Sequence, residues 1–210
     1  MRRTKEEAEI TRQTIIEAAL VLFSEQGVSQ TSLVEIATQA KVTRGAVYWH
    51  FKNKWDLFDA ILSRYDARIE QLSGAGQEEF ESDPLGRLSD LLHFIFVNVG
   101  TREDFRNIFK IFLHEQFLRE REDVPAKIRE FVDKALADKI NTLENAIRKG
   151  QLPADLDTQA GSQMIHTMVE GVVQSWLREP QAFNLAQEAP RYVEATFAIL
   201  KYSLKRTTNE

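Results

Sequence analysis

The sequence predicts an all-α protein, and three observations support this fold class. Apolar residues recur every three or four positions over most of the 210-residue chain, which is the period of a helix with one buried face. Segments that alternate apolar and polar residues between Asn-Gly or Asp-Gly turns, the pattern of a β-hairpin, do not occur. Residues that cap helices stand at the ends of the periodic segments. We therefore expect about nine helices, three in an N-terminal domain and the rest in a C-terminal bundle.

The first predicted helix spans residues 5–26. Ile16, Ala19 and Phe23 share one apolar face of this helix. Gly27 follows directly and can end it, because glycine adopts the left-handed backbone conformation without a steric penalty. The chain therefore begins with a long helix that buries one side.

Two short helices are predicted next, about three residues apart. Thr31 or Ser32 can cap a helix over residues 32–40, and Ser32 stands three positions before Glu35, the spacing of a capping box. Thr43 can cap the following helix, over residues 44–50, since its hydroxyl can accept a bond from a free N–H at the helix start. A long helix followed by two short ones is typical of a helix-turn-helix.

Periodic segments separated by Gly and Pro continue to the end of the chain. A fourth helix, capped by Asn53, has its apolar stripe at Leu57, Ile61, Tyr65 and Ile69. Five more helices are expected over residues 84–99, 104–119, 124–149, 157–179 and 189–205. We place the domain boundary at residue 56, which gives domains 1–56 and 57–210, with a linker-like stretch at 74–83.

Composition excludes several classes of protein. The chain has no Cys, and so no disulfide, thiolate metal site or cysteine nucleophile. Its longest apolar runs are far shorter than the roughly 20 residues of a membrane-spanning helix. The N-terminus has charged residues but no apolar segment of a signal peptide. These features favour a cytoplasmic protein without a membrane partner.

The net charge of −5 is unevenly distributed. Residues 1–56 carry 8 Lys+Arg and 7 Asp+Glu, a balance of +1, whereas residues 57–210 carry 19 and 25, a balance of −6. Between Ile36 and Trp55 there are four Lys and Arg residues and no acidic residue. A local basic stretch on an otherwise acidic chain is typical of a small DNA-binding domain joined to a larger domain that does not bind DNA.

The second short helix carries the residue types that read DNA. In a helix-turn-helix this helix enters the major groove. Arg44 can pair with guanine there, and Thr43 can reach a base edge. Gly45 lets the backbone approach closely, although a helical Gly costs about 0.5 to 1 kcal/mol relative to Ala. The unit therefore predicts binding to double-stranded DNA.

An aromatic and cationic cluster completes the expected interface. We expect Val47 and Phe51 to be core residues, and at least one of Tyr48 and Trp49 to be exposed, because these neighbours point in different directions on a short helix. Ile36, Ala37, Ala40 and Val42 are expected in the core. The residues expected to contact DNA are Thr31 and Ser32 at phosphates, with Thr43, Arg44, Gly45, Tyr48, Trp49, His50 and Lys54.

These residues also carry a family resemblance. The run from Thr31 to Phe58, including VTRGAVYWHFKNK at 42–54, resembles the DNA-binding domain of the TetR family of repressors. The segment EGVVQSWL at 170–177 is similar to the AcrR-like branch, which controls multidrug efflux. The resemblance implies a homodimer on a palindromic operator and release by an apolar or cationic small-molecule inducer, without a cofactor or metal.

Aromatic and Met residues in the C-terminal part suit an apolar ligand cavity. Four residues at helical spacing share a face that looks into the cavity in similar regulators. The expected ligand residues are Phe109, Phe112, Leu113, His166, Val169, Glu170 and Gln174. Small residues and large apolar residues of the last two predicted helices suit a dimer interface of four helices, two from each copy. These residues are Gly161, Gly171, Ser175, Tyr192, Phe197 and Ile199.

Rival functions find less support. Asp90 with His93, and His166 with Glu170, are pairs without a third metal ligand. No Gly-rich phosphate loop or Gly-x-Ser-x-Gly motif is present, so we do not expect an enzyme. A TetR-type regulator of another pathway, or a helical protein-interaction module, remains the alternative.

Overall fold

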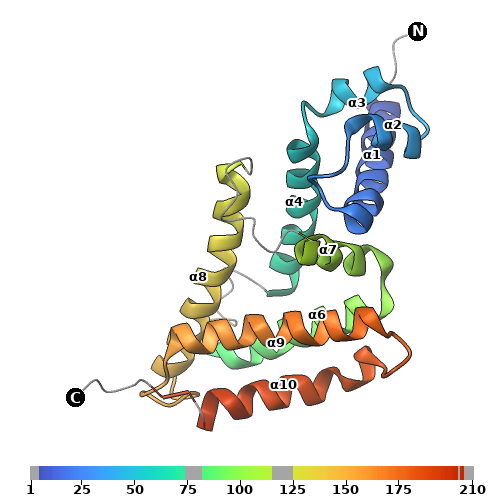
Figure 1. Cartoon of the computed structure of the whole chain (residues 1–210). Coiled ribbons are helices and arrows are strands. Elements are labelled where there is room, and N and C mark those ends of the chain that lie inside the picture. The colour runs from blue at the N-terminus through green and yellow to red at the C-terminus, as the bar shows by residue number, and fades with distance from the viewer. Residues whose placement is uncertain (1–4, 74–81, 115–124, 203, 206–210) are drawn as a thin grey trace. The chain divides into compact units, whose positions relative to one another are not determined.

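The computed structural model describes residues 5–73, 82–114, 125–202 and 204–205. Within these residues it contains nine α-helices and no strand, which confirms the predicted fold class (Figure 1). The helices are α1 Lys5–Gln26, α2 Leu33–Gln39, α3 Arg44–His50, α4 Lys54–Ser73, α6 Pro84–Thr101, α7 Glu103–His114, α8 Ala126–Arg148, α9 Thr158–Arg178 and α10 Leu185–Tyr202.

The chain forms two compact units. The first contains α1–α3, α4 as far as Ala67, and α7; the second contains α6, α9, α10 and α8 from Glu130 onward. The first unit includes a helix from the middle of the chain, and the domain boundary at residue 56 stays a prediction. No described helix combines the length and the apolar composition that a bilayer span requires.

The predicted caps of the first unit are present. Gly27 ends α1 with φ of 83°. At the start of α2 the Ser32 hydroxyl accepts a bond from the Glu35 amide, and the Glu35 carboxylate accepts one from the Ser32 amide. Thr43 caps α3, and Asn53 accepts bonds from the first amides of α4. The helix boundaries of this unit therefore follow from local sequence.

The turn between α2 and α3 is set by backbone hydrogen bonds. The Val42 amide donates to the carbonyl of Ala37, and the Lys41 amide donates to that of Thr38, which is the Schellman pattern of a helix end. Lys41 adopts φ of 54°, a left-handed conformation that costs a non-Gly residue about 1 to 2 kcal/mol. The strained turn determines the direction in which α3 leaves α2.

The core of the first unit joins all of its helices. Ile15 and Phe23 of α1, Ile36 of α2, Val47 of α3 and Phe58 of α4 are fully buried. Helix α7 completes this core on the side of α1, with which it makes extensive contact.

Aromatic and polar contacts attach α7. The Phe112 ring lies 6.5 Å from that of Phe58, edge to face, and the Tyr65 ring lies 5.6 Å from that of Phe105. His114 places Nε2 3.2 Å from the carbonyl oxygen of Ser24, near the end of α1.

The second unit is built on α6 and α10, which lie side by side (Figure 1). Leu92 and Phe96 are buried on α6, and the Phe96 ring is 5.5 Å from that of Tyr192. At Gly100 an added Cβ would lie 3.2 Å from the Ala186 nitrogen, so the end of α6 packs directly on the start of α10.

Helix α10 begins at Leu185, and the prediction of a start at residue 189 is wrong. The side chain of Asn184 accepts a bond from the Gln187 amide, so Asn184 caps the helix and the helix begins four residues before the predicted start. Pro190 lies inside the helix rather than in its first turn. The predicted end of the sixth helix, 115–119, and most of the predicted linker, 74–81, lie outside the described residues.

Candidate nucleic-acid interface

Helix α3 presents one face to solvent and buries the other. Tyr48 is 57% exposed and Trp49 72% exposed, and both are among the few large hydrophobic side chains that the described residues place on the surface. Val47 and Phe51 are buried, as predicted. The Tyr48 hydroxyl and the Trp49 indole N–H are thereby accessible, and such groups can donate to phosphates beside a groove.

The C-terminal end of α3 is held by a contact that the sequence does not reveal. The guanidinium carbon of Arg12, on α1, lies 5.4 Å from the centre of the Phe51 ring, a cation–π geometry. Phe51 also donates its amide hydrogen to the Val47 carbonyl. Arg12 and Phe51 are far apart in the chain, so only the fold brings them together. Arg12 therefore belongs to the residues that position α3.

Arg44 and Gly45 stand in the exposed first turn of α3. A Cβ added at Gly45 would meet only the Thr43 hydroxyl oxygen, at 3.9 Å. The chain itself therefore has room for a side chain at this position. A glycine that the fold does not require is consistent with the predicted close approach of a partner.

The two predicted phosphate contacts before α2 make hydrogen bonds within the chain. Thr31 is 2% exposed, and its hydroxyl donates to the Gly27 carbonyl at 2.8 Å, so its side chain stabilises the turn, and its contact with a phosphate stays a prediction. Ser32 is exposed, but its hydroxyl donates to the Glu35 carboxylate at 2.6 Å. Ser32 can donate to a phosphate only when that bond is exchanged.

Hydrogen bonds from Ser32 also shift the titration of Glu35. The hydroxyl of Ser32, and then its backbone amide, hold the pKa of the Glu35 carboxyl below its ordinary value of 4.5. Glu35 is therefore ionised at neutral pH and stabilises the start of α2, where the positive end of the helix favours an anion.

His50 and Lys54 make contacts within the unit. The His50 ring lies 4.4 Å from that of Trp49, edge to face. The Lys54 ammonium donates to the carbonyl of Ser29, which ties the start of α4 to the loop before α2. An ammonium has three N–H donors, so this bond leaves others for a phosphate. Lys54 therefore combines a structural contact with the predicted one.

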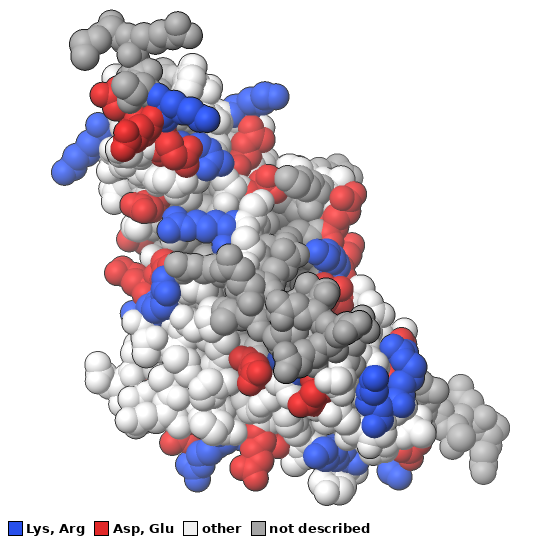
Figure 2. All heavy atoms as spheres, turned by 180° about the vertical axis from the view of Figure 1, so that it is seen from behind, with Lys and Arg blue, Asp and Glu red and all other residues white. Residues whose placement is uncertain are grey.

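Charge on the first unit is mixed rather than uniformly basic. On the face shown in Figure 2, Lys and Arg side chains alternate with Asp and Glu near the N-terminus. The basic character is local to the stretch 36–55, in which Lys41, Arg44 and Lys52 are exposed. Attraction to DNA would therefore be concentrated around α3.

The seven predicted ligand residues belong to both units. On α7, Phe109, Phe112 and Leu113 are half-buried, and the Phe109 ring lies 6.4 Å from that of Tyr65. The other four lie on α9. There His166 is exposed and its Nε2 is 3.7 Å from a carboxylate oxygen of Glu170.

Val169 is buried, and Glu170 and Gln174 are half-buried. In the described part of the chain, no three His, Asp or Glu side chains are placed to share a metal ion. The assignment of all seven residues to a ligand stays a prediction.

Three of the predicted dimer residues are used inside the chain. An added Cβ at Gly161 would lie 3.0 Å from Leu143, so this glycine serves packing within the second unit. Tyr192 packs on Phe96 and Phe183, and Phe197 is half-buried beside α6. The predicted dimer residues that are exposed are Gly171, Ser175 and Ile199.

A capped helix pair that presents Arg44 and exposed aromatics from its second helix is the architecture of a helix-turn-helix DNA-binding protein. Comparison with known families identifies the class further. Residues 15–61 match the model of the bacterial regulatory proteins of the tetR family, and residues 83–202 match the C-terminal region of MAATS-type transcriptional repressors. The chain belongs to the TetR family of transcriptional regulators.

Individual relatives are similar over nearly the whole chain. The HTH-type transcriptional regulator AcrR of Shigella flexneri is 40% identical over 91% of this chain and 90% of its own. The crystal structure of NalD, the secondary repressor of the MexAB-OprM multidrug efflux pump in Pseudomonas aeruginosa, has a TM-score of 0.74 at 33% identity and covers 95% of this chain and 100% of its own.

A third relative was solved with a small molecule. The SmeT–triclosan complex has a TM-score of 0.71 at 28% identity and covers 96% of this chain and 98% of its own. SmeT is the repressor of the Stenotrophomonas maltophilia multidrug efflux pump SmeDEF.

Proposed function

We propose that this protein represses a multidrug efflux operon, bound as a homodimer to a palindromic operator and released by an apolar or cationic small molecule. The observation that carries the proposal is the exposed surface of α3 in a TetR-family chain. The efflux target is supported by relatives named for efflux control, NalD among them. Such a protein acts in the cytoplasm, where its operator lies.

Each residue of the interface has a distinct role in this proposal. Arg44 and Thr43 contact base edges, and Gly45 allows the backbone to come close. The Tyr48 hydroxyl and the Trp49 indole N–H, with His50 and Lys54, donate to phosphates, as does Ser32 once it is released from Glu35. Two copies of α3 in one dimer would read half-sites about 34 to 36 Å apart.

Release requires a ligand that binds the DNA-free conformation more tightly. The proposed ligand residues are Phe109, Phe112 and Leu113 on α7 with the four residues on α9. A ligand that contacts α7 acts directly on the unit that carries α3, because α7 belongs to that unit. Triclosan bound to SmeT supports the proposal that a small apolar molecule can be the effector.

DNA binding is tested by selecting sites from random duplexes and measuring affinity at several salt concentrations. We expect a palindromic site, and Arg44→Ala should weaken it by about 1 to 3 kcal/mol through loss of base contacts. Arg178→Ala, an exposed arginine of α9, is the matched control and should bind normally. No binding of any duplex, or binding that does not fall as the salt concentration rises, would favour the alternative of a protein-interaction module.

Induction is tested by calorimetry with a matched pair of cationic and neutral ligands. Glu170→Gln should weaken the cationic ligand more than the neutral one, because it removes a charge and keeps the shape. The coupling must be reciprocal, so operator DNA should weaken the ligand by the factor by which the ligand weakens DNA. Ligand affinity that is the same with and without operator would contradict the mechanism.

A further inference from the structure

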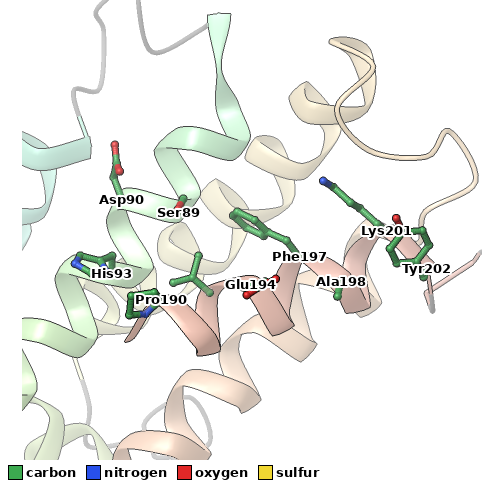
Figure 3. Close-up of a pocket in the computed structure, with 10 residues that line it drawn as sticks. Ser89, Asp90, His93, Pro190, Glu194, Phe197, Ala198, Lys201 and Tyr202 are labelled. Atoms are coloured by element: carbon green, nitrogen blue, oxygen red, sulfur yellow. The ribbon is translucent and has the colours of Figure 1, made fainter. Parts of the chain in front are cut away.

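An open groove of about 600 Å³ runs along α6 and α10 in the second unit (Figure 3). Asp90 and His93 line it from α6, and Glu194, Phe197 and Lys201 from α10. None of its lining residues is among the seven predicted ligand residues. The groove is therefore a separate feature of the molecule, and its volume lies within the range of small-molecule sites.

The chemistry of the groove combines an apolar wall with two carboxylates. Phe197 is half-buried and Tyr202 is 79% exposed, so the groove offers ring surface that the chain itself does not cover. Asp90 and Glu194 are exposed and come from the two opposing helices. Within the described residues, neither carboxylate forms an ion pair. Both negative charges are available to a ligand.

The positive charge of Lys201 does not neutralise the groove. Lys201 lies two helical turns from Glu194 along α10, and Figure 3 shows Asp90 and His93 on α6 toward the other end of the groove. One ammonium against two carboxylates leaves the site net negative. An anionic ligand would therefore be repelled over most of its length.

The Phe197 side of the groove faces away from the proposed dimer surface, and Tyr202, three positions after Ile199, lies at the border between the two. Phe197 and Ile199 are two positions apart, which places them about 200° apart around α10. Ile199, exposed on the face away from the groove, belongs to the surface that we assign to the partner copy. A second copy that packs on Ile199 would leave the Phe197 side accessible.

We propose that this groove binds organic cations with an apolar body, as a second ligand site outside the predicted inducer residues. The apolar body would lie against Phe197 and Tyr202, and the cation would lie between Asp90 and Glu194. A delocalised cation is favoured over a small hydrated one, because it gives up little hydration and interacts well with ring faces. The inference does not depend on DNA binding and goes beyond the proposed repressor function.

The first test uses two probes of nearly equal size and opposite charge, tetraphenylphosphonium and tetraphenylborate. Calorimetry is carried out on the whole protein at low salt without operator DNA. We expect tetraphenylphosphonium to bind and tetraphenylborate to bind at least about tenfold more weakly, since charge alone distinguishes them. Similar binding of both probes, or no binding of the cation, would overturn the proposal.

Charge-neutral variants locate the site. The double variant Asp90→Asn with Glu194→Gln should weaken tetraphenylphosphonium by about fivefold or more. The pair Glu144→Gln with Glu179→Gln removes the same charge from exposed positions outside the groove and should leave binding unchanged. Loss of affinity in Glu170→Gln but not in the groove variant would assign the cation to the predicted inducer site and refute this proposal.

A direct contact measurement completes the test. We expect nuclear Overhauser effects between the probe and the ring protons of Phe197 and Tyr202. Effects confined to other aromatic residues would overturn the proposal of a ligand site in the groove. All of these measurements are made without operator DNA. A negative result therefore refutes the groove site and not the repressor function, whereas a negative operator selection refutes the repressor function and not the groove site.

Discussion

Gly45 is a glycine that the fold of the free protein does not require. The nearest atom to an added Cβ is 3.9 Å away, and the residue lies in the exposed first turn of α3. Alanine would be the better helix former at this position. At this position we therefore expect the residue that best stabilises the free protein to differ from the residue that best binds DNA.

Gly45→Ala should raise the free energy of unfolding by about 0.5 to 1 kcal/mol, because Ala loses less backbone entropy in a helix. The same change should weaken operator binding, since the methyl group would stand where the backbone approaches DNA. Urea denaturation and fluorescence anisotropy with labelled operator measure the two effects. Unchanged operator affinity in the stabilised variant would remove Gly45 from the interface.

Residue roles could be predicted where they depend on local chemistry. The inward position of Val47 and Phe51, and the exposure of at least one of Tyr48 and Trp49, follow from spacing on one short helix, and the structure exposes both rings. The hydroxyl of Thr31 has its acceptor four residues earlier, in the turn after α1, and this geometry is not visible in the sequence. Side-chain hydrogen bonds that compete with a ligand appear only when the turn is built.

Helix ends are the elements that local sequence specifies best. The capping box of α2 is present in both directions, between Ser32 and Glu35. In contrast, the start of α10 is set by Asn184 and by packing of Leu185 and Ala186 on Gly100. A proline near a helix start suggests the first turn, but tertiary contacts moved the start to an earlier residue.

Glu35→Ala should destabilise the first unit in a pH-dependent way. The pKa of Glu35 is lowered in the folded protein, so its contribution is fully present well above 4.5 and is lost as the pH falls through the lower folded value. We expect the melting temperatures of wild type and variant to differ most at neutral pH and to converge below pH 4.5. Glu25→Ala, an exposed acid on α1, is the control. A difference that stays constant from pH 7 to pH 3 would contradict this account.

At the scale of the whole molecule, the proposed dimer depends on which side of α10 is free. Ile199 is 36% exposed, and small exposed residues, Gly171 and Ser175, stand on α9. Phe197, which the sequence suggests equally well, contributes to the groove instead. Periodicity identifies apolar residues on a helix but cannot tell which of them its own neighbours cover.

Ile199→Asp should convert the dimer to a monomer at micromolar concentration, because it would place a charge in an apolar interface. Lys201→Asp makes a larger change of charge on the opposite side of α10 and should remain dimeric. Sedimentation or light scattering distinguishes the two states. A monomeric wild type, or a dimeric Ile199→Asp variant that keeps its helical content, would refute the proposed interface.

The membership of α7 in the first unit has a consequence for recombination. A chimera that takes its DNA specificity from a related repressor would most simply be joined after residue 56, where the helix-turn-helix ends. Such a chimera would join a foreign α1 to the resident α4 and α7, and the contacts of Phe23 with Phe58 and of Ser24 with His114 would then have to form between unrelated partners. A functional graft must therefore carry α4 and, as a separate piece of chain, α7, or preserve the surface of α1 that meets these two helices.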